Sequence, residues 1–378
     1  MFGGQSAEHD VSCTTAAHVL AAVDPARYQV EAIGITRSGQ FVTASEAMAA
    51  LADGAHSLPA ALKAEGPPVN LTALVAENAP GAYPNEVPPA ELPSAPAGAP
   101  IAVQTAGDVV VLPLLHGPLG EDGTMQGMLE LANVAYVGAG VLGSAVTMDK
   151  AMAKTVLDAH GIPQTRWLAV NEIDVDADAD QVAADITETL GLPVFVKPAN
   201  MGSSVGVSRA STEAELVTAL RKALVYDELV VVEEAVEARE IEMSVLGNAD
   251  IEVSVPGEIV PGAEFYDYDD KYLDGSAKLI IPAELPEEVA EQMKTLAVAA
   301  YRALRVEGMA RADFLYEEHG RGPLLNELNT IPGFTPISMY PKMWEASGLA
   351  YSKLIDRLVD LALERHQRRG AKRITNRT

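Results

Sequence analysis

Apolar residues follow two spacings along this chain, and segments with the two spacings alternate. Strand-like runs and alternations occur at 28–42, 108–117, 192–199, 228–236, 240–247, 310–318 and 322–330. Helical spacing occurs at 11–23, 149–161, 211–224, 285–304 and 351–366. Because predicted strands and helices alternate along most of the chain, the pattern predicts an α/β protein.

Local signals mark the ends of three of the predicted helices. Asp149 is the expected N-cap of one helix and Gly161 its stop, with a proline two residues beyond. Thr212 and Glu215 have the spacing of a capping box. Pro286 lies near the first turn of the helix at 285–304. These signals strengthen the helix predictions.

Two stretches depart from this regular pattern. The Gly3-Gly4 turn is of the kind that joins a strand to a helix, yet it has almost no chain before it. We therefore expect the N-terminal domain to lack its first strand. Residues 51–108 are rich in Ala, Pro and Gly, and the proline density at 80–100 predicts a surface insertion without regular structure.

Composition excludes some functions. Among the 378 residues, 53 Asp and Glu stand against 27 Lys and Arg, a net charge of −26, so a nucleic-acid partner is not expected. A single cysteine, Cys13, rules out an intramolecular disulfide and favours a reducing compartment. No apolar stretch reaches membrane-spanning length and no secretory signal pattern begins the chain. We expect a soluble cytoplasmic protein without a membrane partner.

Two glycine-bearing segments are candidates for phosphate binding. Residues 138–143 fit the G-x-G-x-x-G pattern, but no second strand ending in an acid follows at the required distance, so we interpret them as a flexible connection between domains. At 197–207 a strand delivers Lys197 into a loop of small residues, whose N–H groups could surround phosphate oxygens. The alternative for this loop is a bare turn between strands.

A predicted hairpin carries oxygen ligands. Glu327 and Asn329 are two apart on one strand and therefore share a face. If residues 311–330 pair as a hairpin, Asp313 joins them, and Arg311 lies on the same face. Carboxylate and amide oxygens suit Mg²⁺ bound together with phosphates, and the arginine suits a developing negative charge. The alternative is a surface ladder of salt bridges.

A third segment has the composition of a lid. Residues 264–276, EFYDYDDKYLDGS, are unusually aromatic for a chain with 5% aromatic residues. Exposed aromatic side chains in a polar loop are typical of a loop that becomes ordered over a ligand.

Together these segments resemble the ATP-grasp superfamily and, within it, the D-alanine–D-alanine ligases. The similar stretches, in family order, are FGGQSAEHDVS, HGPLGEDGTMQGMLE, YVGAGVLGSAVTMDK, VKPANMGSSVGVS, FYDYDDKY, RADF, NELNTIPGFTPISMYPKMW and GLAYSKLIDRLVDLA. The resemblance implies an N-terminal substrate domain at 1–147, a central ATP-grasp subdomain at 148–236, a C-terminal one at 237–366 and a basic tail at 367–378. It also implies a homodimer.

The resemblance assigns roles to individual residues. Those implied to bind ATP are Lys150 and Lys197 on the phosphates, Ser203 and Ser204 in the loop, Glu233 and Glu240 on adenine and ribose, and Phe265 over the nucleotide. Those implied to bind two Mg²⁺ or Mn²⁺ ions are Asp313, Glu327 and Asn329. Those implied to be catalytic are Glu8, Ser203, Tyr272, Arg311 and Gly333. Those implied to frame the substrates are His116, Lys271, Ser338 and Met339.

The implied reaction condenses two D-alanine molecules through an acyl phosphate, in the synthesis of peptidoglycan precursors. Glu8 would pair with the ammonium group of the first D-alanine, and Arg311 with the Gly333 backbone would stabilise the oxyanion. Two alternatives remain: a D-alanine–D-lactate ligase, and an ATP-binding protein with impaired catalysis. Tyr272 argues against the first, because such relatives carry Phe in the matching loop.

Overall fold

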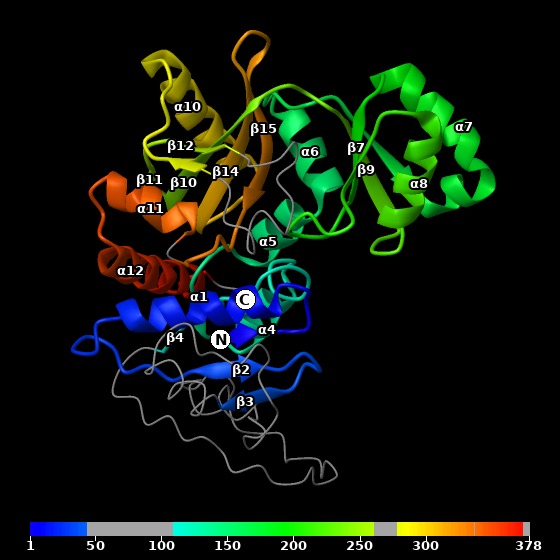
Figure 1. The fold of residues 1–378 in the computed structure, drawn as a ribbon. Helices are drawn as coiled ribbons and strands as arrows, with labels where there is room; N and C mark the ends of the chain where they lie inside the picture. Colours follow the sequence, from blue (N-terminus) through cyan, green and yellow to red (C-terminus); the bar gives the residue numbers. More distant parts are fainter. Residues whose placement is uncertain (44–108, 261–277, 336, 373–378) are drawn as a thin grey trace, which may run out of the picture.

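The structure is a computed structural model that describes residues 1–43, 109–260, 278–335 and 337–372. The predicted insertion near 51–108 and the predicted lid at 264–276 lie wholly outside these residues. So do Phe265, Lys271 and Tyr272. The N-terminal part contains two small sheets, and the central and C-terminal parts contain one sheet each (Figure 1).

The N-terminal part combines short strands with helices. Its elements are β1 (Phe2–Gly3), α1 (His9–Ala22), β2 (Ile33–Ile35), β3 (Phe41–Thr43), β4 (Val110–Val111), α4 (Thr124–Leu131), β5 (Ala135–Tyr136) and α5 (Val141–Met148). β1 pairs with β2 in parallel, and so does β4 with β5. The strand expected at 108–117 is therefore parallel, as predicted, but only its residues 110–111 form it.

The expectation that the first strand is missing is wrong. β1 is present as two residues and Phe2 is 2% exposed, packed in a cluster with residues of α1 and α12. Phe2 also forms a parallel bridge with Leu114. A strand of two residues is too short to show an alternating pattern in the sequence. The burial of Phe2 and the pairing with β2 hold this strand in place.

The central part is a sheet covered by two helices. Its elements are α6 (Lys150–Ala159), β6 (Trp167–Asn171), α7 (Glu172–Leu190), β7 (Val194–Pro198), β8 (Ser208–Ala210), α8 (Glu213–Ala223) and β9 (Leu229–Glu234). The sheet order is β6-β9-β7-β8, and α7 and α8 share its hydrophobic core (Figure 1). Both predicted caps form: Asp149 accepts the N–H of Met152, and Thr212 accepts that of Glu215.

The C-terminal part is built around a larger antiparallel sheet. Its elements are β10 (Arg239–Gly247), β11 (Ile251–Val253), β12 (Gly257–Val260), β13 (Lys278–Ile280), α10 (Glu287–Ala303), β14 (Gly308–Glu317), β15 (Gly322–Asn329), α11 (Met339–Ala346) and α12 (Tyr351–Gly370). The sheet order is β13-β12-β10-β14-β15, and β11 pairs with the C-terminal end of β10. β14 and β15 form the predicted hairpin.

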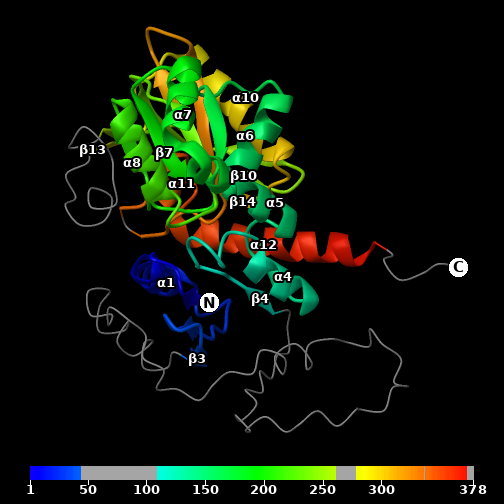
Figure 2. The ribbon, with the colours of Figure 1, turned by 90° about the vertical axis from the view of Figure 1, so that its right-hand side faces the viewer.

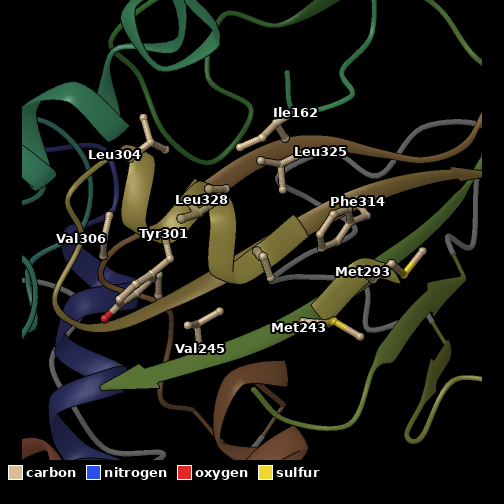
Figure 3. Close-up of a cluster of buried hydrophobic side chains, with 14 of the residues drawn as sticks. Ile162, Met243, Val245, Met293, Tyr301, Leu304, Val306, Phe314, Leu325 and Leu328 are labelled. Carbon is tan, nitrogen blue, oxygen red and sulfur yellow. The ribbon is translucent and has the colours of Figure 1, made fainter. Parts of the chain in front are cut away.

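Alternation along these strands separates a core face from a polar face. Met243 and Val245 of β10 and Phe314 of β14 pack against Tyr301 of α10 in one buried cluster (Figure 3). On β14, Arg311 and Asp313 alternate with the core residues Ala310, Ala312 and Phe314. They point to the opposite face because successive side chains of a strand alternate. The sheet is therefore sealed on one side and available for chemistry on the other.

A β-bulge in β15 keeps the apolar side chains of this strand on the core face. Asp313 faces Glu327 and Phe314 faces Leu325, so Asn326 is the extra residue on β15. The insertion lets both Leu325 and Leu328 enter the core, although they are three positions apart. Sequence alternation predicted the hairpin but not this irregularity.

The G-x-G-x-x-G segment is not a flexible connection. Gly140 precedes α5 directly, and a Cβ added to Gly143 would lie 2.7 Å from the carbonyl oxygen of Arg305. The segment is thus a packed turn and helix. The exclusion of a dinucleotide fold was nevertheless right, because α5 is followed by α6 and the next strand belongs to another sheet.

The last helix joins the C-terminal part to the N-terminal part. In both views α12 lies between the C-terminal sheet and the N-terminal elements (Figure 1, Figure 2). The buried Arg365 donates hydrogen bonds to the carbonyl oxygens of Tyr136 and Gly138, and its guanidinium lies 4.2 Å from the centroid of the Tyr136 ring. α12 runs to Gly370, so residues 367–370 of the predicted tail are helical, while 373–378 lie outside the described residues.

Candidate active site

A cavity of about 620 Å³ opens where the three parts meet. Every predicted site residue that the structure describes lines it. The N-terminal part contributes Glu8 and His116. The central part contributes Lys150, Lys197, Ser203, Ser204 and Glu233. The C-terminal part contributes Glu240, Arg311, Asp313, Glu327, Asn329, Gly333, Ser338 and Met339. Residues more than 300 positions apart in sequence therefore face one space.

The loop after β7 contains a tight turn at two serines. Ser203 and Ser204 have φ angles of 47° and 58°, a left-handed conformation that is costly for residues other than glycine. Consecutive residues with such angles turn their N–H groups toward one side, where they can surround an anion. The same φ angles belong to the two central residues of a turn that is closed by a hydrogen bond from the Val205 N–H to the Gly202 carbonyl oxygen at 3.0 Å, so the backbone suits phosphate binding and the bare turn alike.

The same loop carries a link to the N-terminal part. The hydroxyl of Ser203 donates a hydrogen bond to Oε1 of Glu8. The other oxygen of Glu8 lies beside Gly117 and Gly202. Cβ atoms added to these glycines would lie 2.6 and 2.8 Å from this oxygen, so the carboxylate occupies space that side chains would fill. Glu8 is 6% exposed. Two glycines and one serine thus hold a buried carboxylate at the edge of the phosphate loop.

Lysines converge beside this loop. Lys150 Nζ donates to the carbonyl oxygen of Met201 at 2.5 Å, and Lys197 Nζ donates to Glu233 Oε1 at 3.0 Å. Lys154, which the sequence analysis missed, lies 3.4 Å from the other oxygen of Glu233. The signal was present, since Lys154 is four residues after Lys150 and therefore on the same face of α6.

Glu233 is saturated with polar partners. Thr165, also missed in the sequence analysis, donates to Glu233 Oε2 at 2.8 Å. Burial alone raises the pKa of this carboxyl, but Lys154 and Lys197 outweigh burial and lower the pKa to about 2. In this structure Glu233 therefore orders two lysine ammonium groups beside the cavity.

The hairpin brings the predicted metal ligands together. Asp313 and Glu327 form a register pair across β14 and β15, and Asn329 pairs with Arg311 one step further along. Arg311 forms a two-bond contact with Asp313, Nε to Oδ1 at 2.7 Å and Nη2 to Oδ2 at 2.6 Å. These side chains line the cavity, so the arrangement is not a surface ladder of salt bridges.

The donor set fits Mg²⁺ or Mn²⁺ held together with phosphate oxygens. Asp313, Glu327 and Asn329 offer only hard oxygen donors on one face of the hairpin. Within the described residues, no three Asp, Glu, His or Cys side chains lie close enough to hold a metal ion on their own. A cation at this site would therefore need further ligands, which is usual for Mg²⁺ at sites where phosphates bind.

The part of the cavity lined by Glu8 and His116 contains one further residue that the sequence analysis did not single out, although it lies in the stretch GEDG after His116. Glu121 is 7% exposed, lines the cavity and accepts the N–H of Gly117 at 2.6 Å. Burial raises the pKa of its carboxyl to about 8, the Glu8 carboxylate adds to the rise, and N–H groups of Gly117 and Ile331 oppose it. Burial also lowers the pKa of His116.

Replacing Glu121 by Gln is expected to stabilise the protein at alkaline pH. The pKa of Glu121 rises on folding from 4.5 to about 8, so its contribution to stability is full below pH 4.5 and is lost as pH rises toward 8. Gln cannot ionise, so the variant should melt on the order of 2 °C higher at pH 8.5 and show no gain at pH 4.5. Melting curves at both pH values test this. An equal difference at the two values would contradict the assignment.

The segment after β15 closes the far end of the cavity. Ser338 Oγ accepts the N–H of Thr335 at 3.0 Å and lies 2.8 Å from its hydroxyl. A Cβ added to Gly333 would lie 2.7 Å from Ser338 Oγ, so a larger residue there would displace the Ser338 hydroxyl. Met339 begins α11 and packs against Ile259 and Met343. The backbone of Gly333 is therefore open to a ligand in the cavity.

A small-residue loop and Lys197 of one antiparallel sheet, with Lys150 of α6 beside them, face oxygen ligands on a second sheet, and this arrangement defines an ATP-grasp enzyme. Two family models match the chain: "D-ala D-ala ligase N-terminus" at residues 1–139 and "D-ala D-ala ligase C-terminus" at 156–360. The chain belongs to the D-alanine–D-alanine ligase family. The fold class expected from the resemblance, a three-part α/β ATP-grasp architecture, is confirmed.

Curated relatives are similar over nearly the whole chain. D-alanine–D-alanine ligase of Listeria innocua serovar 6a is 45% identical over 376 residues, covering 98% of this chain and 96% of the relative. The enzyme of the same name from Geobacillus kaustophilus is 43% identical over 367 residues, covering 97% and 94%.

Solved structures are similar as well. D-alanine–D-alanine ligase from Coxiella burnetii has a TM-score of 0.75 at 35% identity, covering 98% of this chain and 94% of that one. A D-Ala:D-Ser ligase from Enterococcus faecalis has a TM-score of 0.77 at 31% identity, covering 96% and 97%. In the described part of the chain, no helix combines the length and apolarity needed to cross a membrane.

Proposed function

We propose that the protein joins two D-alanine molecules to D-alanyl-D-alanine, converting ATP to ADP and phosphate, and so supplies a peptidoglycan precursor in the cytoplasm. The observation that carries this proposal is the Glu8–Ser203 contact. It places a candidate ammonium-binding carboxylate against the phosphate loop, where an amino acid's carboxylate and a γ-phosphate could meet. The extent of the similarity to curated ligases supports the same substrates.

ATP binds, in this proposal, between the central and C-terminal sheets. Lys150 and Lys197 hold its phosphates, with the N–H groups around Ser203 and Ser204, and Glu240 with Glu233 lies toward adenine and ribose. Lys154 acts through Glu233. It contacts one oxygen of that carboxylate while Lys197 contacts the other, so the Glu233 side chain is held between the two ammonium groups. Phe265 is proposed to cover the nucleotide, and it lies outside the described residues.

Asp313, Glu327 and Asn329 are proposed to hold two Mg²⁺ or Mn²⁺ ions. Bound there, the ions would neutralise negative charge on the phosphates. Lys150 and Lys197 would neutralise the same phosphate charge, because they line the same cavity as the three proposed metal ligands. The two sheets therefore present positive groups and metal ligands from opposite sides.

Acyl transfer is proposed to follow phosphoryl transfer in the same space. Glu8 orients the first D-alanine through its ammonium group, so that the carboxylate of this D-alanine attacks the γ-phosphorus, ADP leaves, and an acyl phosphate forms. The amine of the second D-alanine then attacks the acyl carbon, and phosphate leaves. Arg311 and the Gly333 backbone stabilise the oxyanion, with His116, Ser338 and Met339 around the substrates. Lys271 and Tyr272 keep their proposed roles at the second substrate and beside Ser203.

A coupled assay tests this function directly. The protein is mixed with ATP, Mg²⁺ and D-alanine, and phosphate release and the dipeptide product are measured. D-Lactate and D-serine are then offered with D-alanine as alternative second substrates. We expect D-alanyl-D-alanine as the main product. Phosphate release that is unchanged by omitting D-alanine would overturn the proposal, and a depsipeptide as main product would favour the D-lactate alternative. We also propose that the enzyme is a homodimer.

A further inference from the structure

Glu242 of β10 is a buried carboxylate to which the proposed reaction gives no role. It is 6% exposed and forms a register pair with Asp313 on β14. Asp313 in turn pairs with Glu327 on β15. Residues paired in register on adjacent strands project to the same face, so the three carboxylates form one row across the sheet and all line the cavity.

Arg311 is shared between two members of this row. Its guanidinium makes the two-bond contact with Asp313, and its Nε atom also lies 3.1 Å from Glu242 Oε2. The side chains of Arg311, Glu242 and Asp313 are 19%, 8% and 14% exposed. Ion pairs with so little access to water are only weakly screened, so the choice of partner matters energetically.

The contact between Arg311 and Asp313 conflicts with the role proposed for Asp313. Both of its carboxylate oxygens accept hydrogen bonds from the guanidinium. A divalent cation needs at least one of those oxygens as a ligand, and two cations in direct contact with one carboxylate repel each other. Each carboxylate oxygen has a second lone pair, so a cation can bind beside the guanidinium, but the repulsion favours a partial release of Asp313 by Arg311 when the metal site is loaded.

We propose that Glu242 is a positioning residue that retains Arg311 in the cavity when Asp313 turns to the divalent cation. The inference rests on the proposed function, because it uses the proposed metal ligands. With Glu242 present, the guanidinium keeps one buried anionic partner and its Nη atoms can turn toward the substrates. Without Glu242, Asp313 is left as the carboxylate with the two-bond contact to Arg311, so Arg311 competes more strongly with the metal for it.

The test measures how much a metal ion strengthens nucleotide binding, without turnover. Calorimetry gives the affinity of the full chain for ADP with Mn²⁺ and with EDTA, and the ratio of the two is the metal-dependent gain. Glu242→Gln should lower this gain about tenfold, as expected when a partner of a ligand is removed. Its affinity for ADP in EDTA should stay as in the unmodified protein. Glu242→Asp, which keeps the carboxylate, should recover part of the gain.

A double-mutant cycle separates positioning from direct ligation. In the background Arg311→Met no guanidinium competes for Asp313, so Glu242→Gln should no longer change the gain. If the tenfold loss persists there, Glu242 acts on the metal itself and the inference is overturned. An unchanged gain in the single variant Glu242→Gln, or no gain in the unmodified protein, overturns it as well.

Glu258→Gln is the matched control. Glu258 is also a buried carboxylate of this sheet, 7% exposed, and forms a two-bond contact with Arg239 at 2.8 and 2.8 Å. Its loss should lower the melting temperature and leave the metal-dependent gain unchanged. Equal losses of gain in both variants would indicate general loosening and overturn the inference. The coupled assay on the unmodified protein is independent, so failure of the proposed function is recognised separately.

Discussion

Replacing Glu327 by Gln is expected to lower turnover by at least about a hundredfold while the fold survives. Glu327 faces Asp313 in register across the hairpin, and its neighbours Leu325 and Leu328 carry the packing on the opposite face. Gln keeps the shape and removes the negative charge that a divalent cation needs. The measurement is phosphate release at saturating ATP, Mg²⁺ and D-alanine, together with a melting curve.

Glu317→Gln provides the control for this variant. Glu317 lies on β14, pairs with Arg321 near the hairpin turn and is outside the cavity. Its loss should leave turnover within about twofold, since pairs near the surface are worth roughly 0–1 kcal/mol. Near-normal turnover of the Glu327 variant at saturating Mg²⁺ would remove Glu327 from the metal site.

Replacing Gly202 by Ala is the second change with a large expected effect. The new Cβ would lie 2.8 Å from Glu8 Oε2, too close for the present position of the carboxylate. Glu8 must therefore move within a site that also binds it to Ser203. A displacement of about 1 Å at a positioning group can cost on the order of 100-fold in rate, so we expect a 10- to 100-fold loss of kcat/KM for D-alanine.

Gly127→Ala is the matched substitution for this test. Gly127 lies in α4, and no atom is within 4 Å of an added Cβ. The change should leave kcat/KM for D-alanine as it is. The affinity for ATP in the Gly202 variant should fall much less than kcat/KM for D-alanine. A Gly202 variant with unchanged kinetics would show that the position of Glu8 does not limit the reaction.

The hairpin illustrates what the sequence could predict. Alternation of polar and apolar residues placed Asp313, Glu327 and Asn329 on one face, and the structure brings them together. The bulge at Asn326 was beyond prediction, because an extra residue is tolerated only where a partner strand and a core are already in place. Local periodicity reports the faces of a strand but not its register.

Contacts between distant residues account for what sequence reasoning missed. Glu233 was assigned by resemblance to adenine and ribose, yet its two oxygens contact Lys154, Lys197 and Thr165, which come from three separate segments. Nothing local to any of these residues indicates the other partners. The turn at 138–143 was interpreted as flexible for the same reason, since its fit against Arg305 depends on tertiary packing.

The contacts of α12 have a consequence for the order in which the protein can fold during synthesis. β1 and α1 leave the ribosome long before α12, but part of their buried surface is covered by Leu354 and Leu358 of that helix. At roughly 5–20 residues per second, that helix follows tens of seconds later. All strands of the central sheet, in contrast, lie within residues 167–234, so this sheet can form as soon as these residues have been synthesised. The nascent N-terminal part is therefore incompletely buried until α12 has been made, and we expect it to expose apolar surface during that interval.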